Sequence, residues 1–261
     1  MYSQAAWLIS IGRIPYKDFF LAQPPFWFFL TSIFINLLGS SIFSIRIVSV
    51  ISSILLIGLI YFLCRNIFGK IESIAASVIY AIHPYIVFWG KIGILEPLAS
   101  LFLFTGVMIF LSNVNFSSRK MLLSGALIGV AFLTKYSILF FIVGAFPILL
   151  YSVLRKVSMI ELLKCIGCIA LGMVIVIIPF ICYLCYVNAY YEFYLDTYVA
   201  QRLMFRFPEW VSLGFWGEFF VNLKFEIFLL IVYPLVFILA RKIGFRSICI
   251  SQLDEIALFS G

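Results

Sequence analysis

The sequence predicts an all-α protein: a polytopic bundle of transmembrane helices with interfacial or re-entrant helices in its first exoplasmic loop. Of its 261 residues, 65% are hydrophobic and only 11% are charged, whereas about a quarter of a soluble domain is charged. The apolar residues form long stretches, and the basic residues gather in the short segments between them. The net charge of +7 therefore indicates membrane orientation rather than nucleic-acid binding, because no basic face is formed.

Several apolar stretches are predicted to cross the ~30 Å hydrocarbon core of a bilayer. They are residues 42–63, 74–89, 97–111, 121–133, 138–154, 160–187 and 225–240. Several of them are short, which suggests tilt, a thin membrane or misplaced boundaries. Residues 26–38 are apolar but too short to span, which favours an interfacial or re-entrant helix. The preceding Pro24-Pro25 pair lacks backbone N–H groups and fixes φ, so it ends any earlier helix and can open this one at Phe26.

The basic residues predict the orientation of the bundle. With seven spans, four basic clusters fall on one side, and cytoplasmic loops are the ones enriched in Lys and Arg. The clusters are Arg65 with Lys70, Arg119 with Lys120, Arg155 with Lys156 and Lys164, and Arg241 with Lys242 and Arg246. We expect one integral domain: an exoplasmic segment 1–41, spans within 42–240, and residues 241–261 as a cytoplasmic tail or the start of a further span.

The charged segment 12–25 is the most specific motif of the chain. It reads GRIPYKDFFLAQPP and precedes an aromatic helix. This G-x-x-P-Y-x-D-F-F-x-x-Q-P-P pattern resembles the first exoplasmic loop of the C-type, polytopic glycosyltransferases that use lipid-linked sugars. That family includes protein O-mannosyltransferases and the aminoarabinose transferase of lipid A. Members of that family have an acidic pair just before the segment that corresponds to residues 2–6 of this chain. The corresponding position would precede Met1, so the resemblance leads us to expect an N-terminally truncated chain.

Glu96 is the first candidate for chemistry. A carboxylate at the lip of an apolar span is costly unless it faces water, a cation or a metal. The alternatives are a solvated loop charge or a carboxylate that favours the helix dipole. The resemblance implies function, since related transferases place an acidic residue of their active-site cavity at the L-[DE]-P turn, here Leu95-Glu96-Pro97.

Lys135 is the first candidate for binding the donor phosphate. A lone lysine between two spans can extend to the headgroups, or it can bind a lipid phosphate as a point charge. The resemblance implies the second role, because Leu133-Thr134-Lys135 is similar to a family motif that faces the donor phosphate. Other candidate phosphate ligands are Lys91, Arg202 and Arg206; the last two lie in an aromatic segment that is alternatively an interfacial belt.

The first loop supplies the remaining candidates. Asp18 is a second candidate catalytic carboxylate, able in principle to activate an acceptor hydroxyl as a general base, or else to orient the loop. Tyr16, Gln23 and Pro24 are expected to line the cavity.

The predicted function is transfer of a sugar from a polyprenyl-phosphate donor to a protein, glycan or lipid acceptor at the exoplasmic face of the cell membrane. The alternatives are a catalytically incomplete fragment or scaffold of such an enzyme, and a lipid-sugar transporter or flippase, which the scarcity of ionisable residues at mid-depth disfavours. No cofactor is assigned, although a divalent metal ion is compatible with the chemistry. The pairs Cys165/Cys168 and Cys182/Cys185 are not predicted to bind zinc, because one apolar helix would separate Cys168 and Cys182 by about 21 Å.

Overall fold

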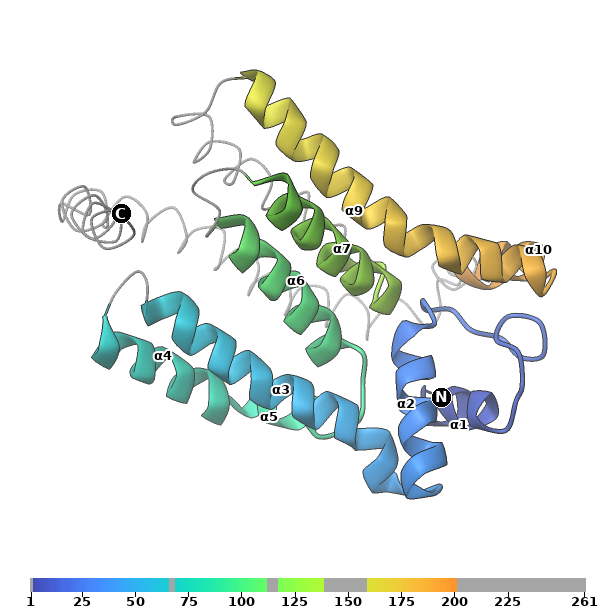
Figure 1. Cartoon of the computed structure of the whole chain (residues 1–261). Helices are drawn as coiled ribbons and strands as arrows, with labels where there is room; N and C mark the ends of the chain where they lie inside the picture. Colours follow the sequence, from blue (N-terminus) through green and yellow to red (C-terminus); the bar gives the residue numbers. More distant parts are fainter. Residues whose placement is uncertain (1, 66–68, 112–116, 139–158, 201–261) are drawn as a thin grey trace, which may run out of the picture. The chain divides into compact units, whose positions relative to one another are not determined.

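The regular structure of the chain is helical, as expected. A computed structural model describes residues 2–65, 69–111, 117–138 and 159–200 (Figure 1). In these ranges every regular element is a helix, and the only β-type pairing is an isolated bridge between Pro15 and Phe19. The chain divides into two compact units, residues 1–201 and 202–261, of which only the first is described below.

The first 41 residues contain two helices that pack on each other. Helix α2, Phe26–Leu38, begins directly after the two prolines, as predicted, and ends at Gly39 with φ 82°. Helix α1, Tyr2–Ser10, was not predicted from the sequence. It contacts α2, and its buried small residues Ala5 and Ala6 allow the two helices to lie close together.

Two of the described helices are long and apolar enough to cross a membrane. They are α3, Ile42–Arg65, and the Leu163–Tyr186 part of α9, Met159–Tyr186; each candidate span has 24 residues, or about 36 Å of helix. Only 22% and 11% of their most apolar windows are buried. The core helix of a soluble protein would be mostly buried, so the exposed apolar side chains favour contact with lipid.

The stretch 74–89, predicted as one span, is instead broken. It comprises α4, Lys70–Ile82, and α5, Pro84–Gly90, with His83 between them at φ −61° and ψ 120°. The cause is Pro84, whose ring pushes the preceding residue out of the helical region and whose nitrogen cannot donate a hydrogen bond.

The next two helices follow the sequence pattern closely. Helix α6, Glu96–Leu111, and helix α7, Ser118–Thr134, match the predicted stretches 97–111 and 121–133 within three residues. Apart from Ile138, the predicted span 138–154 lies outside the described residues, as do 225–240 and the segment 241–261. The complete seven-span arrangement therefore stays a prediction.

Helix α7 lies between α6 and α9, while α3 contacts the other side of α6 and α4 lies beside α3 (Figure 1). Glycine sets the α7–α9 distance. A Cβ built on Gly125 would lie 2.1 Å from the carbonyl oxygen of Ile169, and one built on Gly172 would lie 2.1 Å from that of Leu122. Ser124 additionally donates a hydrogen bond of 2.7 Å to the Gly106 carbonyl of α6. Small residues thus bring three helices together, as is usual in membrane bundles.

Candidate functional site

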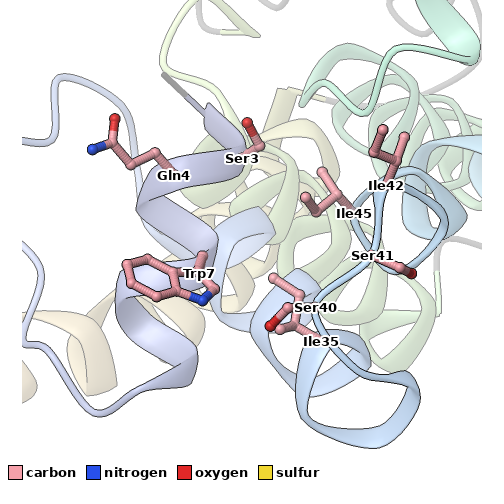
Figure 2. A pocket seen from close by; sticks show the side chains of 8 residues that line it. All are labelled: Ser3, Gln4, Trp7, Ile35, Ser40, Ser41, Ile42 and Ile45. Carbon is pink, nitrogen blue, oxygen red and sulfur yellow. The ribbon is translucent and has the colours of Figure 1, made fainter.

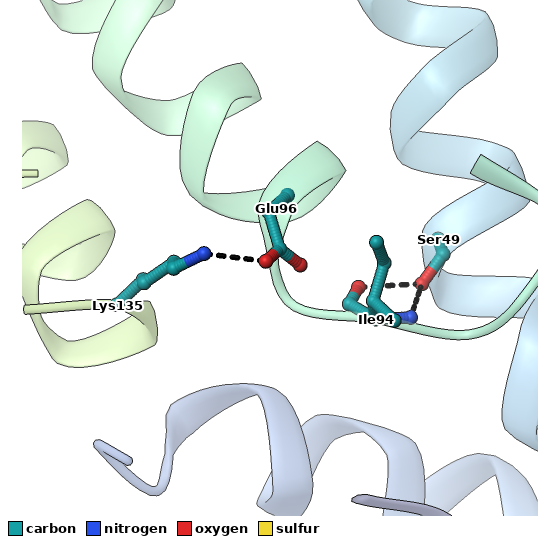
Figure 3. Close-up of polar contacts among 4 residues, drawn as sticks. All are labelled: Ser49, Ile94, Glu96 and Lys135. Atoms are coloured by element: carbon teal, nitrogen blue, oxygen red, sulfur yellow. Dashed lines mark hydrogen bonds and ion pairs between the residues drawn. The ribbon is translucent and has the colours of Figure 1, made fainter. Parts of the chain in front are cut away.

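The turn between α5 and α6 is fixed to α3 by paired hydrogen bonds. Ser49 donates to the carbonyl of Ile94 at 2.7 Å and accepts from its N–H at 2.9 Å (Figure 3). Gly93 has φ 82°, and a Cβ on it would lie 3.1 Å from the Ile45 carbonyl oxygen. Only glycine fits this close, left-handed turn. The turn delivers Glu96 to the first turn of α6, two residues after the anchored Ile94.

Glu96 and Lys135, both candidates from the sequence, form an ion pair. Lys135 follows α7 with an extended backbone, φ −153° and ψ 122°, and its N–H still bonds the Ala131 carbonyl. Its Nζ donates a hydrogen bond to Oε1 of Glu96 (Figure 3). The side chains are 26% and 43% exposed for Lys135 and Glu96, so the pair is reachable from outside.

The second oxygen of the carboxylate, Oε2 of Glu96, is buried and has no hydrogen-bond partner in the described part of the chain. A buried acceptor without a partner is costly and calls for an explanation, such as a bound water, ion or substrate group. Oε2 therefore has unused acceptor capacity while Oε1 binds Lys135.

Tyr2, which the sequence did not single out, lies at the same site. Its ring packs edge-on against Trp27 and Phe28, with centroid separations of 6.5 and 5.9 Å. Burial is the larger cause that raises the pKa of Tyr2, and the nearby Glu96 carboxylate raises it further. On the same face of α2, Trp27 Nε1 and Thr31 Oγ1 are buried without partners among the described residues. One sequence pattern could have indicated Tyr2. Tyr2, Ala5 and Ala6 are spaced three and four residues apart, so they share one face of a helix and predict that this face is packed.

The first loop is held by Tyr16. This residue is 3% exposed and has φ 68°, a conformation uncommon for a bulky side chain. Its hydroxyl donates to the carbonyl of Gln23 at 2.9 Å. Pro24 is fully buried and Gln23 is half-buried. Asp18 is exposed and accepts a hydrogen bond of 2.8 Å from the Ile14 N–H, so it closes a turn within the loop.

The segment after α9 fastens the loop. It contains α10, Tyr190–Tyr194, and the π-helix η1, Leu195–Val199. Lys17 Nζ donates to the Val187 carbonyl at 2.9 Å, and Oδ2 of Asp196 accepts from the Leu21 N–H at 2.9 Å. Burial raises the pKa of Asp196. The hydrogen bond from the Leu21 N–H lowers it in part, and the charge of Glu192 raises it further. Sequence reasoning had not selected Asp196, since nothing local distinguishes it from other interfacial carboxylates.

The other predicted phosphate ligands are Lys91, Arg202 and Arg206. Lys91 is exposed in the turn after α5, and Arg202 and Arg206 lie outside the described residues. Within the described ranges, no three His, Cys, Asp or Glu side chains come together in a way that could hold a metal ion. Four cysteines do lie on the single helix α9, as expected.

A separate open pocket of about 320 Å³ lies between α1 and the corner that joins α2 to α3 (Figure 2). No charged side chain lines it, so it does not fit a phosphate. Its lining residues are Ser3, Gln4, Trp7, Ile35, Ser40, Ser41, Ile42 and Ile45.

Comparison with known proteins places this arrangement in a family. The model of the dolichyl-phosphate-mannose-protein mannosyltransferase family matches residues 22–186, well over half of the chain. The chain belongs to that family. At the family level, membership means a membrane glycosyltransferase that uses a polyprenyl-phosphate sugar and, in general, a protein acceptor. No curated protein and no solved structure matches the chain. Glu96 and Lys135 both lie inside the matched region.

Proposed function

We propose that the chain transfers a sugar from a polyprenyl-phosphate donor to an acceptor at the exoplasmic face of the membrane, with Glu96 and Lys135 at the reaction centre. The observation that carries the proposal is the partly exposed ion pair whose second carboxylate oxygen is buried without a partner. Family membership supplies the class of donor.

Lys135 and Glu96 each have one role in the proposed reaction. The acceptor oxygen forms a bond to the anomeric carbon of the sugar, while the bond from that carbon to the phosphate oxygen breaks and the polyprenyl phosphate leaves. Lys135 places a positive charge where the leaving phosphate gains negative charge. The Glu96 carboxylate takes the proton of the acceptor hydroxyl, acting as a general base. Asp18, held by the Ile14 N–H, orients the loop in this scheme.

The proposed face follows from the basic clusters. Arg65 lies at the end of α3, and Lys120 lies in the first turn of α7. Glu96 begins α6 and Lys135 follows the end of α7. In the predicted topology, these two pairs of residues lie on opposite sides of the membrane. Because basic residues favour the cytoplasm, the ion pair would face the exoplasm. In this proposal Lys91, Arg202 and Arg206 are further candidate ligands of the donor phosphate, and the chemistry is compatible with a divalent metal ion.

The test is transfer from a radiolabelled polyprenyl-phosphate mannose in membranes that contain the chain. We expect Glu96→Gln and Lys135→Gln each to lower transfer about 100-fold, the usual cost of losing a general base or a charge stabiliser. Lys120→Gln is the matched control, since it removes an exposed lysine from the other end of α7.

Transfer at the wild-type rate in both pair variants would refute the site. An absence of transfer from the unaltered chain, in membranes where a related transferase is active with the same donor, would instead favour the scaffold alternative. Vectorial movement of the donor without transfer would favour the transporter.

A further inference from the structure

The end of α9 presents a carbonyl group that the first loop binds. Asn188 has φ 54°, so the chain leaves the helix in a left-handed conformation. The N–H groups of Asn188 and Ala189 bond back to carbonyls of the last helical turn at 3.1 and 3.0 Å, as in a Schellman motif. This motif does not use the carbonyl of Val187, which accepts a hydrogen bond of 2.9 Å from Lys17 Nζ. A lysine is favoured at this end of a helix, because the helix dipole is negative there.

A second contact binds the first loop four residues further along. Leu21 is 4% exposed and lies in irregular structure, so no neighbouring turn of a helix accepts its N–H. Buried backbone donors are almost always paired. Oδ2 of Asp196, in η1, accepts this N–H at 2.9 Å. We call the Lys17–Val187 and Asp196–Leu21 hydrogen bonds the loop clamp.

Aromatic rings pack beside the loop clamp. The ring of Tyr16 lies edge-on to Phe193 of α10 and tilted against Phe180 of α9, at centroid separations of 5.1 and 6.4 Å. Phe180 and Phe193 are themselves in edge-on contact at 5.6 Å. Tyr16 has φ 68°, and a bulky residue keeps such a conformation only where its surroundings enforce it. Rings and charged groups together therefore fix the loop on residues that lie 170 and 175 positions later in the chain.

The clamped loop shares a core with the turn that carries Glu96. Leu21 and Val187, one from each clamp contact, belong to a single cluster of buried side chains. That cluster also contains Leu95 and Leu98, which lie on either side of Glu96 and Pro97 in the sequence.

The helix that follows the loop contacts α6 directly. Phe26, the first residue of α2, lies edge-on to Phe102 of α6 at a centroid separation of 5.9 Å. The Ser49 hydrogen bonds hold the turn before α6 from α3. The loop and α2 thus support the start of α6 through contacts that α3 does not supply.

We propose that Lys17 and Asp196 are a pair of positioning residues that lock the first loop on the segment after α9 and so hold the Leu95–Glu96 turn in place. Their effect on catalysis rests on the proposed function, whereas their effect on the turn does not. If the two hydrogen bonds only fasten the loop, their removal leaves the start of α6 unchanged.

The first experiment measures amide hydrogen exchange of the whole chain in lipid nanodiscs, without activity. We expect Lys17→Met to speed exchange about fivefold both in residues 18–23 and in residues 94–102. This is the change in the opening equilibrium for the loss of one ordinary hydrogen bond. Asp196→Ala should speed exchange of residues 94–102 by the same factor. Lys17→Arg and Asp196→Asn, which keep a donor and an acceptor, should exchange close to the parent rate, as should Arg13→Met at an exposed cation of the same loop.

Parent-rate exchange of residues 94–102 in both Lys17→Met and Asp196→Ala overturns the proposal, whatever happens in the loop. Faster exchange that extends to residues 124–131 of α7 would show general loosening and would also contradict it. The Lys17 side chain is exposed, so Lys17→Met is expected to fold, and it decides alone if Asp196→Ala is not recovered.

The second experiment separates this proposal from the proposed function. In the otherwise native chain, Lys17→Met should lower kcat about fivefold and leave the KM for polyprenyl-phosphate mannose unchanged, because a displaced Glu96 affects the chemical step. Faster exchange of residues 94–102 together with no transfer by the unaltered chain would sustain the positioning role and reject the proposed reaction. Faster exchange of residues 94–102 with an unchanged kcat would contradict a role of the loop clamp in catalysis.

Discussion

At the scale of single residues, the Glu96–Lys135 pair is better suited to binding than to stability. A pair that is partly open to solvent contributes about 1 kcal/mol or less, because water screens it and two flexible side chains must be ordered. In the proposed reaction, weakening this pair would therefore cost little when Lys135 binds the donor phosphate. One carboxylate oxygen of Glu96 is buried without a hydrogen-bond partner in the described structure, which is costly and adds nothing to stability.

Tyr136 gives a residue-scale prediction for the pH dependence of stability. Burial raises the pKa of Tyr136 to about 12, although Thr197 and Tyr16 act in the opposite direction. The unfolded tyrosine loses its proton near pH 10, as an unperturbed tyrosine does. Between about pH 10 and 12 the folded state binds more protons, so stability falls as pH rises, by up to ~3 kcal/mol.

Thermal unfolding in detergent from pH 9 to pH 12 would show this loss. Tyr136→Phe should have a flatter profile than the unaltered chain, whereas Tyr186→Phe, at a side chain that is 90% exposed, should not. Identical slopes for all three proteins would contradict a buried, neutral Tyr136.

At the scale of helices, close packing of α7 on α9 gives the second prediction. Gly125→Ala and Gly172→Ala each force a Cβ to 2.1 Å from a backbone carbonyl oxygen of the other helix, and the helices must separate. We expect each to destabilise the protein by about 1–3 kcal/mol, as overpacking does. Gly167→Ala on α9 is the control, because nothing lies within 4 Å of its added Cβ and alanine favours the helix. Thermal unfolding measures all three, and equal midpoints would contradict the packing.

The sequence predicts single helices better than it predicts their neighbours. The limits of α2 follow from Pro25 and Gly39, and those of α6 from an uninterrupted apolar run. The break at His83 was missed, although Pro84 restricts the residue before it. Helix α1 was missed since it is short and gains stability from its contact with α2, which local patterns do not contain.

For the candidate site too, the sequence predicts single residues better than the contacts between them. Glu96 and Lys135 were recognised separately, from a charge at the edge of an apolar stretch and from short motifs. Their contact joins positions 39 residues apart, and no local pattern specifies it. Tyr2 carries a common side chain whose nearness to Glu96 depends on the packing of α1, so only the folded arrangement distinguishes it.

At the scale of the whole molecule, the predicted orientation decides which side of the membrane holds the reaction. α3 and α9 are the two helices among the described residues that meet the length and hydropathy of a span. If α3 crosses from the exoplasm to the cytoplasm, the broken pair α4–α5 returns the chain to Lys91, and α6 brings it back to the basic start of α7. Lys91 then shares the exoplasmic face with Glu96, while Lys70 and Lys120 lie in the cytoplasm.

This orientation is tested with single cysteines in a chain whose own six are replaced by alanine. Ser40→Cys and Lys91→Cys, both at exposed positions, should react with a membrane-impermeant maleimide on intact cells. Lys70→Cys and Lys120→Cys should react only after permeabilisation, because basic residues are retained on the cytoplasmic side. The reversed pattern would place the ion pair in the cytoplasm and reject exoplasmic transfer. Reaction of Lys91→Cys and Lys70→Cys on one side would show that the helices broken at His83 do not cross the membrane.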